Sequence, residues 1–158
     1  MDRNMKAEVL AVDDHSLILE GICKVVNRMP EAVVANYATT GEEALKFINA
    51  RDYDVYILDV NLPDMSGFDL IKRIRELNAQ ARIIINTMHE EIWIVNRLLK
   101  AGVNAIHLVE GVGYQRISSC CQSCLAGWQL CLSSFYGNSE KAKLCVCCLG
   151  GQGCAYAS

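Results

Sequence analysis

The chain has 158 residues, of which 52% are hydrophobic, and a formal net charge of −3. This length suffices for one domain with a substantial core and a short appendage, but not for two full domains. Basic residues are spread along the sequence, and no apolar run reaches membrane-spanning length or forms a signal core, so we expect a cytoplasmic protein with neither a nucleic-acid footprint nor a membrane partner.

The first half of the sequence predicts an order of strand, helix, strand, helix. A β-rich run ends on Asp13 and Asp14, and apolar residues at helical spacing follow it until Pro30. Thr40 and Glu43 then provide a capping box for a second helix. The expected elements are a strand over 8–12, a helix over 15–29, a strand over 32–37, and a helix that carries Ala44, Leu45 and Ile48.

The segment 54–67 is the stretch around which the rest of the chain is organised. An apolar run of strand length ends on Asp59, and Pro63 and Gly67 follow shortly afterwards. This pattern predicts a buried strand with Asp59 at its exposed carboxyl end. Ser66 is expected to cap a third helix, whose core-facing residues are Phe68, Leu70, Ile71, Ile74 and Leu77.

The later part of the sequence continues the alternation. A strand over 82–86 ends at Thr87, a helix over 90–101 is stopped by Gly102, and 104–109 is a candidate fifth strand. Alternation of this kind predicts a parallel sheet with helices on both faces. Because the carboxyl ends of parallel strands meet on one rim, the Asp13–Asp14 pair, Asp59 and Thr87 should converge there.

Such a cluster favours phosphoryl chemistry. Three carboxylates in one small site raise one another's pKa unless a cation lies among them. Oxygen ligands with room for water suit Mg²⁺, whose coordination is commonly completed by phosphate oxygens. An aspartate carboxylate can act as a nucleophile toward phosphorus, and the hydroxyl group of Thr87 could donate a hydrogen bond to a phosphoryl oxygen.

Three motifs carry a family resemblance. They are Leu-Ala-Val-Asp-Asp-His-Ser over 10–16, Leu-Asp-Val-Asn-Leu-Pro-Asp-Met-Ser-Gly over 58–67, and the dipeptide Asn86-Thr87. In this order and spacing they resemble the receiver domain of two-component response regulators, over roughly residues 6–108. The segment from Leu17 to Gly21 is similar to receivers that are attached to a LuxR-type helix-turn-helix domain.

The resemblance implies a doubly wound α/β fold of the flavodoxin-like kind, with a five-stranded parallel sheet of order 2-1-3-4-5. It implies that Asp59 accepts a phosphoryl group from the phosphohistidine of a sensor histidine kinase, and that Thr87 shifts toward the phosphate. Asp14, Asp59 and the backbone carbonyl of Asn61 would hold Mg²⁺, with Asp13 assisting. The protein would then be a phosphorelay switch that regulates transcription and can form a homodimer, with at most autophosphatase activity and no independent substrate turnover.

The family pattern breaks in the fifth strand. Receivers commonly carry a segment such as Lys-Ala-Gly-x-Asn-Gly-Tyr-Leu-x-Lys, whereas residues 100–109 read Lys-Ala-Gly-Val-Asn-Ala-Ile-His-Leu-Val. Val109 therefore stands where the phosphate-pairing Lys is expected, and Ile106 stands at the position of an aromatic switch residue; one hypothesis is that His107 replaces this aromatic. Loss of the ammonium removes a charge-assisted contact worth about 1.5–3 kcal/mol, so we expect impaired output.

The sequence divides into a receiver over 1–109 and a Cys-rich tail over 110–158. Cys23 alone among the nine cysteines precedes residue 120, and the tail predicts neither an amphipathic fifth helix nor a DNA-binding domain. One hypothesis is translation out of frame, because removing one CATC repeat from a conceivable coding sequence for 105–111 yields Ala-Ile-Ser-Ser-Lys. A disordered, thiol-rich tail is the other reading of this composition.

A zinc site in the tail is a competing interpretation. Cys121 pairs with Cys124, and Cys145 with Cys148, in two C-x-x-C units near zinc-ribbon separation, which would make the protein a receiver fused to a zinc-binding tail. A further alternative is a non-phosphorylated interaction module with an acidic pocket, whose partner docks on the helix over 90–101. A hydrolase related to aspartyl-phosphate phosphatases ranks last, since no acid or base is visible beside the nucleophile.

Three residues have simpler interpretations. Cys23 lies on an otherwise apolar helix and is expected to be a core thiol. His15 is interpreted as a helix-start residue beside the acidic pair rather than as a metal ligand, and His89 as the residue that begins the helix over 90–101.

Overall fold

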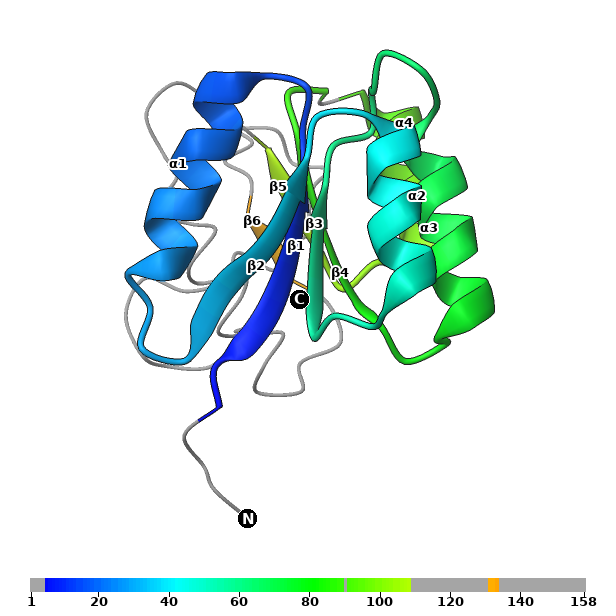
Figure 1. The fold of residues 1–158 in the computed structure, drawn as a ribbon. Coiled ribbons are helices and arrows are strands. Elements are labelled where there is room, and N and C mark those ends of the chain that lie inside the picture. The colour runs from blue at the N-terminus through cyan, green and yellow to red at the C-terminus, as the bar shows by residue number, and fades with distance from the viewer. Residues whose placement is uncertain (1–4, 90, 109–130, 134–158) are drawn as a thin grey trace.

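A central sheet lies between two layers of helices (Figure 1). The computed structural model describes residues 5–89, 91–108 and 131–133. Helix α1, Ser16–Asn27, covers one face of the sheet. The other face is covered by α2, Gly41–Ala50, α3, Gly67–Leu77, and α4, Ile92–Lys100. None of the helices in the described part of the chain has the length and hydrophobicity that a membrane span requires.

The sheet is parallel throughout and confirms the predicted strand order. Strands β1, Ala7–Val12, β2, Ala32–Ala38, β3, Val55–Leu58, β4, Arg82–Thr87, and β5, Ala105–Leu108, are arranged as β2-β1-β3-β4-β5. A short sixth strand, β6, Cys131–Ser133, extends this order beside β5. The sequence does not predict β6, because three residues are too few to show the alternation of a strand.

Both predicted helix caps are present. The Thr40 hydroxyl oxygen accepts a hydrogen bond from the Glu43 backbone N–H at 3.2 Å, and the Ser66 hydroxyl oxygen accepts one from the Phe68 N–H at 3.2 Å. The Glu43 carboxylate reaches back to the Thr39 N–H at 3.0 Å, which completes a variant of the capping box. Val109 and the Cys-rich tail over 110–158, for which no complete fifth helix is predicted, lie outside the described residues, except for β6.

The hydrophobic core has two parts because alternate strand residues face opposite sides of the sheet. Ile57 and Ile84 pack with Leu19, Ile22 and Val26 of α1. Leu58 and Ile85 instead pack with residues of the other three helices, among them Ile48, Leu70, Ile74 and Leu98. Within each of these strands, consecutive residues therefore face opposite sides of the sheet.

Some apolar residues that were expected in the core are not buried. Leu17, Leu77 and Ile92 are 77%, 47% and 72% exposed. Each lies in the first or last turn of its helix, and helical spacing alone overestimates their burial there. Cys23 is also only half-buried, since it lines a surface groove beside Tyr37 rather than the core.

Arg75 of α3 ties together the turns that precede β4 and β5. Its guanidinium donates to the carbonyl oxygen of Ala81 and, at 2.7 Å, to that of Gly102. We expect Arg75→Met, which keeps the apolar stem but loses these donors, to lower the free energy of unfolding by about 1–3 kcal/mol, measured by urea denaturation.

Arg73→Met is the matched control for this prediction. Arg73 donates from the same helix to Asn49 and Glu76, both of which are exposed, so its loss is expected to cost less than about 1 kcal/mol. Equal losses for the two variants would contradict the structural role of Arg75.

Candidate functional site

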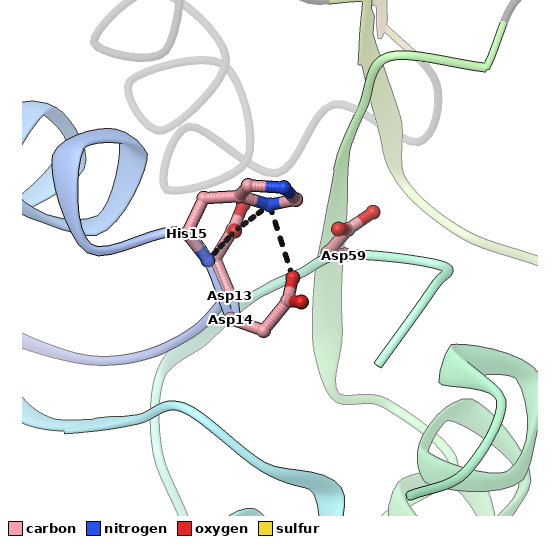
Figure 2. A group of neighbouring side chains, drawn as sticks. All are labelled: Asp13, Asp14, His15 and Asp59. Carbon is pink, nitrogen blue, oxygen red and sulfur yellow. Dashed lines mark hydrogen bonds and ion pairs between the residues drawn. The ribbon is translucent and has the colours of Figure 1, made fainter. Parts of the chain in front are cut away.

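Strand register places the acidic residues side by side at the carboxyl rim of the sheet. Val12 of β1 pairs with Leu58 of β3, so the residues that follow, Asp13 and Asp59, are neighbours. The Asp59 N–H donates to the Val12 carbonyl oxygen at 2.9 Å, which continues the pairing beyond the strands. One oxygen each of Asp13, Asp14 and Asp59 and one nitrogen of His15 lie within 4.8 Å of one another (Figure 2).

These side chains line a cavity of about 390 Å³. Asp13 and Asp59 are buried, with 1% and 7% of their surface exposed, whereas Asp14 and His15 are exposed. The site therefore has a buried floor of two carboxylates and an open side toward solvent. The other lining residues are Ile18, Asn61, Leu62, Pro63, Asn86, Met88 and His89.

Burial weakens the acidity of the two buried carboxyl groups, and repulsion from a neighbouring carboxylate adds to this effect. Burial, and then the negative charge of Asp13, raise the pKa of Asp59 to about 6, against smaller opposing effects of the Asn61 and Val60 backbone N–H groups. Burial likewise raises the pKa of Asp13, although two hydrogen bonds from His15 lower it. A cation in the cavity would relieve this repulsion, so the cluster is arranged to bind one.

His15 occupies the N-cap position of α1, as expected, but its ring does not cap the helix. The ring Nδ1 instead lies 3.2 Å from an oxygen of Asp13 and 3.0 Å from an oxygen of Asp14 (Figure 2). The charge of Asp14 and the contact with Asp13 raise the pKa of His15. When protonated, the ring would partly neutralise the acidic pair.

Thr87 ends β4 and is buried, but the residues beside it, Asn86 and Met88, line the cavity. Its hydroxyl oxygen accepts a hydrogen bond from the His89 backbone N–H at 3.1 Å. The His89 ring contacts the Asn61 side chain across the mouth of the cavity. The prediction that His89 begins a helix is therefore wrong, since α4 begins at Ile92, with Glu91 at its N-cap position.

A buried polar pair, Asn86 and His107, is a feature of the site that the sequence did not predict. The two residues are partners in the β4–β5 register, are 1% and 2% exposed, and join His107 Nδ1 to Asn86 Oδ1 at 2.6 Å. One sign of the pair was present in the sequence, because the polar His107 stands where the receiver segment has Leu. His107 does not replace the missing aromatic, because it faces away from Ile106, which packs with the residues of α4.

The family model of the response regulator receiver domain matches residues 9–107. The chain is a member of this family. The receiver is 31% identical to the response regulator UvrY of Escherichia coli O6:H1 over 119 residues, which cover 75% of this chain and 54% of the relative. It is 28% identical to the response regulator GacA of Pseudomonas aeruginosa over 120 residues, which cover 76% of this chain and 56% of the relative. The chain thus spans about half the length of the curated relatives it matches.

Solved receiver structures share the fold. The isolated REC domain of RcsB from Salmonella enterica serovar Typhimurium, in the presence of phosphomimetic BeF3⁻, matches with a TM-score of 0.73 and 23% identity, over 79% of this chain and 92% of that one. The signal receiver domain of the putative response regulator NarL from Mycobacterium tuberculosis matches with a TM-score of 0.70 and 28% identity, over 77% of this chain and 98% of that one.

The residues of this receiver fit the magnesium site that receivers generally have. The cluster offers carboxylate oxygens in a cavity with room for water, which is the donor set that Mg²⁺ prefers. The same cavity is lined by Asn86, whose Nδ2 is buried without a hydrogen-bond partner in the described part of the chain. An amide donor cannot bind a cation, so the cavity has one group that suits an anion as well.

Proposed function

We propose that this receiver is a phosphoryl-accepting switch that acts in the cytoplasm and regulates transcription. In this proposal Asp59 takes a phosphoryl group from the phosphohistidine of a sensor histidine kinase. The observation that carries it is the convergence of Asp13, Asp14 and Asp59 on one cavity, in a chain that belongs to the receiver family. The receiver can act as a homodimer, while nothing in its charge supports DNA binding by the receiver itself.

The transfer begins with attack by a carboxylate oxygen of Asp59 on phosphorus. An O–P bond forms while the P–N bond of the phosphohistidine breaks, and the released electron pair stays on the imidazole nitrogen of the kinase, which takes up a proton from solvent. Because the pKa of Asp59 is about 6, its carboxyl group is charged and nucleophilic at neutral pH. Attack at lower pH would be slower, since protonation removes the nucleophile.

Asp14, Asp59 and the backbone carbonyl of Asn61 would hold Mg²⁺, and Asp13 would assist from the buried side. When bound, the ion supplies neutralisation of the charge on the transferring group. Asp13 and Asp59 are buried by the surrounding core, so they are fixed in place before the phosphodonor arrives. Asp14 is exposed and leaves the open side of the site accessible to the donor.

Thr87 would transmit phosphorylation to the loop that precedes α4. Its hydroxyl oxygen accepts the His89 N–H, so the hydroxyl proton remains available to a phosphoryl oxygen. Turning toward the phosphate would weaken the bond to His89 and release Met88 and His89. With Val109 at the position of the expected Lys, the second link, from phosphate to the end of β5, is missing, and we infer that output is impaired.

Phosphate uptake tests this proposal. We expect wild-type protein with Mg²⁺ and acetyl phosphate to gain one phosphoryl group by intact-mass spectrometry, and Asp59→Asn to gain none. Asp54→Asn, an exposed position five residues earlier, is the control and should be phosphorylated like the wild type. Uptake by Asp59→Asn would contradict the assignment of the nucleophile. Absence of uptake by the wild type would instead favour an interaction module with an acidic pocket.

A further inference from the structure

Four polar side chains form a row across the sheet at its carboxyl rim. Val12, Leu58 and Ile85 are register partners in adjacent strands, so Asp13, Asp59 and Asn86 follow them side by side. Asn86 is in turn the register partner of His107. The row therefore runs from the acidic cluster into β4 and β5, where Asn86 and His107 are buried polar residues directly after the apolar Ile85 and Ile106.

The amide of Asn86 is only half satisfied. Its Oδ1 accepts from His107, but its Nδ2 is buried and has no hydrogen-bond partner in the described residues. Buried polar groups in folded proteins nearly always have partners, so an unpartnered donor in a cavity wall points to a ligand that accepts its hydrogen bond. Asn86 lines the same cavity as Asp59, and the two residues directly follow the register partners Leu58 and Ile85, so Asn86 lies on the strand beside the proposed phosphoacceptor.

His107 fixes which end of the amide is left for a ligand. The 2.6 Å contact joins Nδ1 of His107 to the carbonyl oxygen of Asn86, so the ring carries its hydrogen on Nδ1 and donates it. Both side chains are buried and belong to adjacent strands of the same sheet. The pair is therefore held rigidly. His107 contacts the oxygen of the Asn86 amide, which leaves the amide nitrogen for a ligand.

We propose that Asn86 is a phosphoryl-binding residue of this receiver and that His107 is its positioning residue. Nδ2 of Asn86 donates a hydrogen bond to an oxygen of the phosphoryl group on Asp59, and His107 holds the amide in the orientation that permits this. The inference rests on the proposed function. A neutral amide donor supplies part of the contact that is lost with Val109, but not its charge, and it anchors the phosphoryl group to β4 rather than to the end of β5.

The test separates binding of the cation from binding of the phosphoryl group. Beryllofluoride, formed from Be²⁺ and fluoride in the presence of Mg²⁺, is the phosphoryl probe, and Mg²⁺ alone is the cation probe; both affinities are measured by titration calorimetry. Asn86→Asp retains the size and the bond to His107 but replaces the donor with an acidic oxygen. We expect it to bind beryllofluoride about ten- to a hundredfold more weakly, with Mg²⁺ affinity unchanged or increased.

Further variants guard against a purely structural explanation. Asn86→Leu should show the same loss of beryllofluoride affinity with unchanged Mg²⁺ affinity, which also demonstrates that the acidic site is intact. His107→Leu should weaken beryllofluoride binding, and His107→Gln, which can still donate to Asn86, should restore part of it. Ile85→Val, a buried change on the opposite face of β4, should alter neither affinity.

The outcomes distinguish the two proposals. If the wild type binds beryllofluoride and both Asn86 variants bind it equally well, the role of Asn86 is overturned while the phosphoryl switch stands. If the Asn86 variants lose affinity for Mg²⁺ and beryllofluoride in parallel, Asn86 supports the fold of the site rather than the phosphoryl group. If the wild type does not bind beryllofluoride at all, the proposed function itself fails.

Discussion

Without divalent cations at pH 7.5, the Asp59→Asn variant is expected to be more stable than the wild type by about 1–3 kcal/mol. The reason is that the wild-type carboxylate is charged at this pH although it is buried beside Asp13. An amide of the same shape removes the charge and keeps an oxygen that can accept the Asn61 N–H, which lies 3.4 Å from the Asp59 carboxylate. Urea denaturation in the presence of a chelator measures the difference.

The pH dependence of this difference has a defined sign. The pKa of Asp59 is about 6 in the folded protein and near its ordinary value of 3.8 in the unfolded chain, so between these values the folded state binds more protons. The wild type therefore gains stability from this group as the pH falls from about 6 to about 4, and the advantage of Asp59→Asn should shrink across the same range. A difference that is constant from pH 7.5 to 4.5 would contradict this explanation.

Asp64 provides a control of opposite sign. Its carboxylate accepts hydrogen bonds from the Gly41 and Glu42 N–H groups at 2.8 Å each, and these bonds lower its pKa. Its contribution to stability is present above the ordinary pKa and is lost as the pH falls through the lowered folded value. Asp64→Asn is therefore expected to destabilise the protein at pH 7.5, whereas Asp59→Asn stabilises it.

Added Mg²⁺ should reverse the comparison between Asp59→Asn and the wild type. A ligand that binds only the folded state stabilises it more the further its concentration exceeds Kd, and the wild type offers one more carboxylate than the variant, so its Kd should be lower. The same charge that destabilises the metal-free fold is the charge that a cation and a phosphoryl donor require. The proposed function would thus account for three carboxylates at a site where the stability of the metal-free fold favours fewer.

The convergence of the acidic residues was predictable from the sequence because it depends only on topology. Strand periodicity placed Asp13 and Asp59 at carboxyl ends, and a parallel sheet brings such ends to one rim. The caps at Thr40 and Ser66 were equally predictable, since each is a local interaction within three residues. These features need no knowledge of how side chains pack against one another.

The features that were missed depend on contacts between residues that are distant in sequence. The Asn86–His107 pair joins positions 21 residues apart, and the Asn61–His89 contact joins positions 28 apart. The register of the strands had to be known before either pair could be recognised. By contrast, the place of His15 at the start of α1 beside the acidic pair was predicted, since it follows from neighbouring positions in the sequence.

Gly67→Ala, which adds one methyl group beside the site, is expected to lower the free energy of unfolding strongly. A Cβ at this position would lie 2.8 Å from the Val60 Cα and would overlap the carbonyl oxygen of Asp59. These are backbone atoms, and the Gly67 N–H already donates to the Val60 carbonyl oxygen at 2.6 Å, so neither side can yield without moving the other. We expect a loss of about 1–3 kcal/mol or more in the free energy of unfolding.

The same substitution should also impair phosphorylation in whatever protein remains folded. Because the added methyl displaces the segment that carries Asp59, a shift of about 1 Å in the nucleophile can slow transfer by about a hundredfold. Gly41→Ala is the matched control: its Cβ would meet the flexible side chain of Met65, which can move aside, so both stability and the rate of phosphate uptake should change less. Equal effects of the two substitutions would show that the close approach of α3 to the Asp59 backbone does not hold the nucleophile in position.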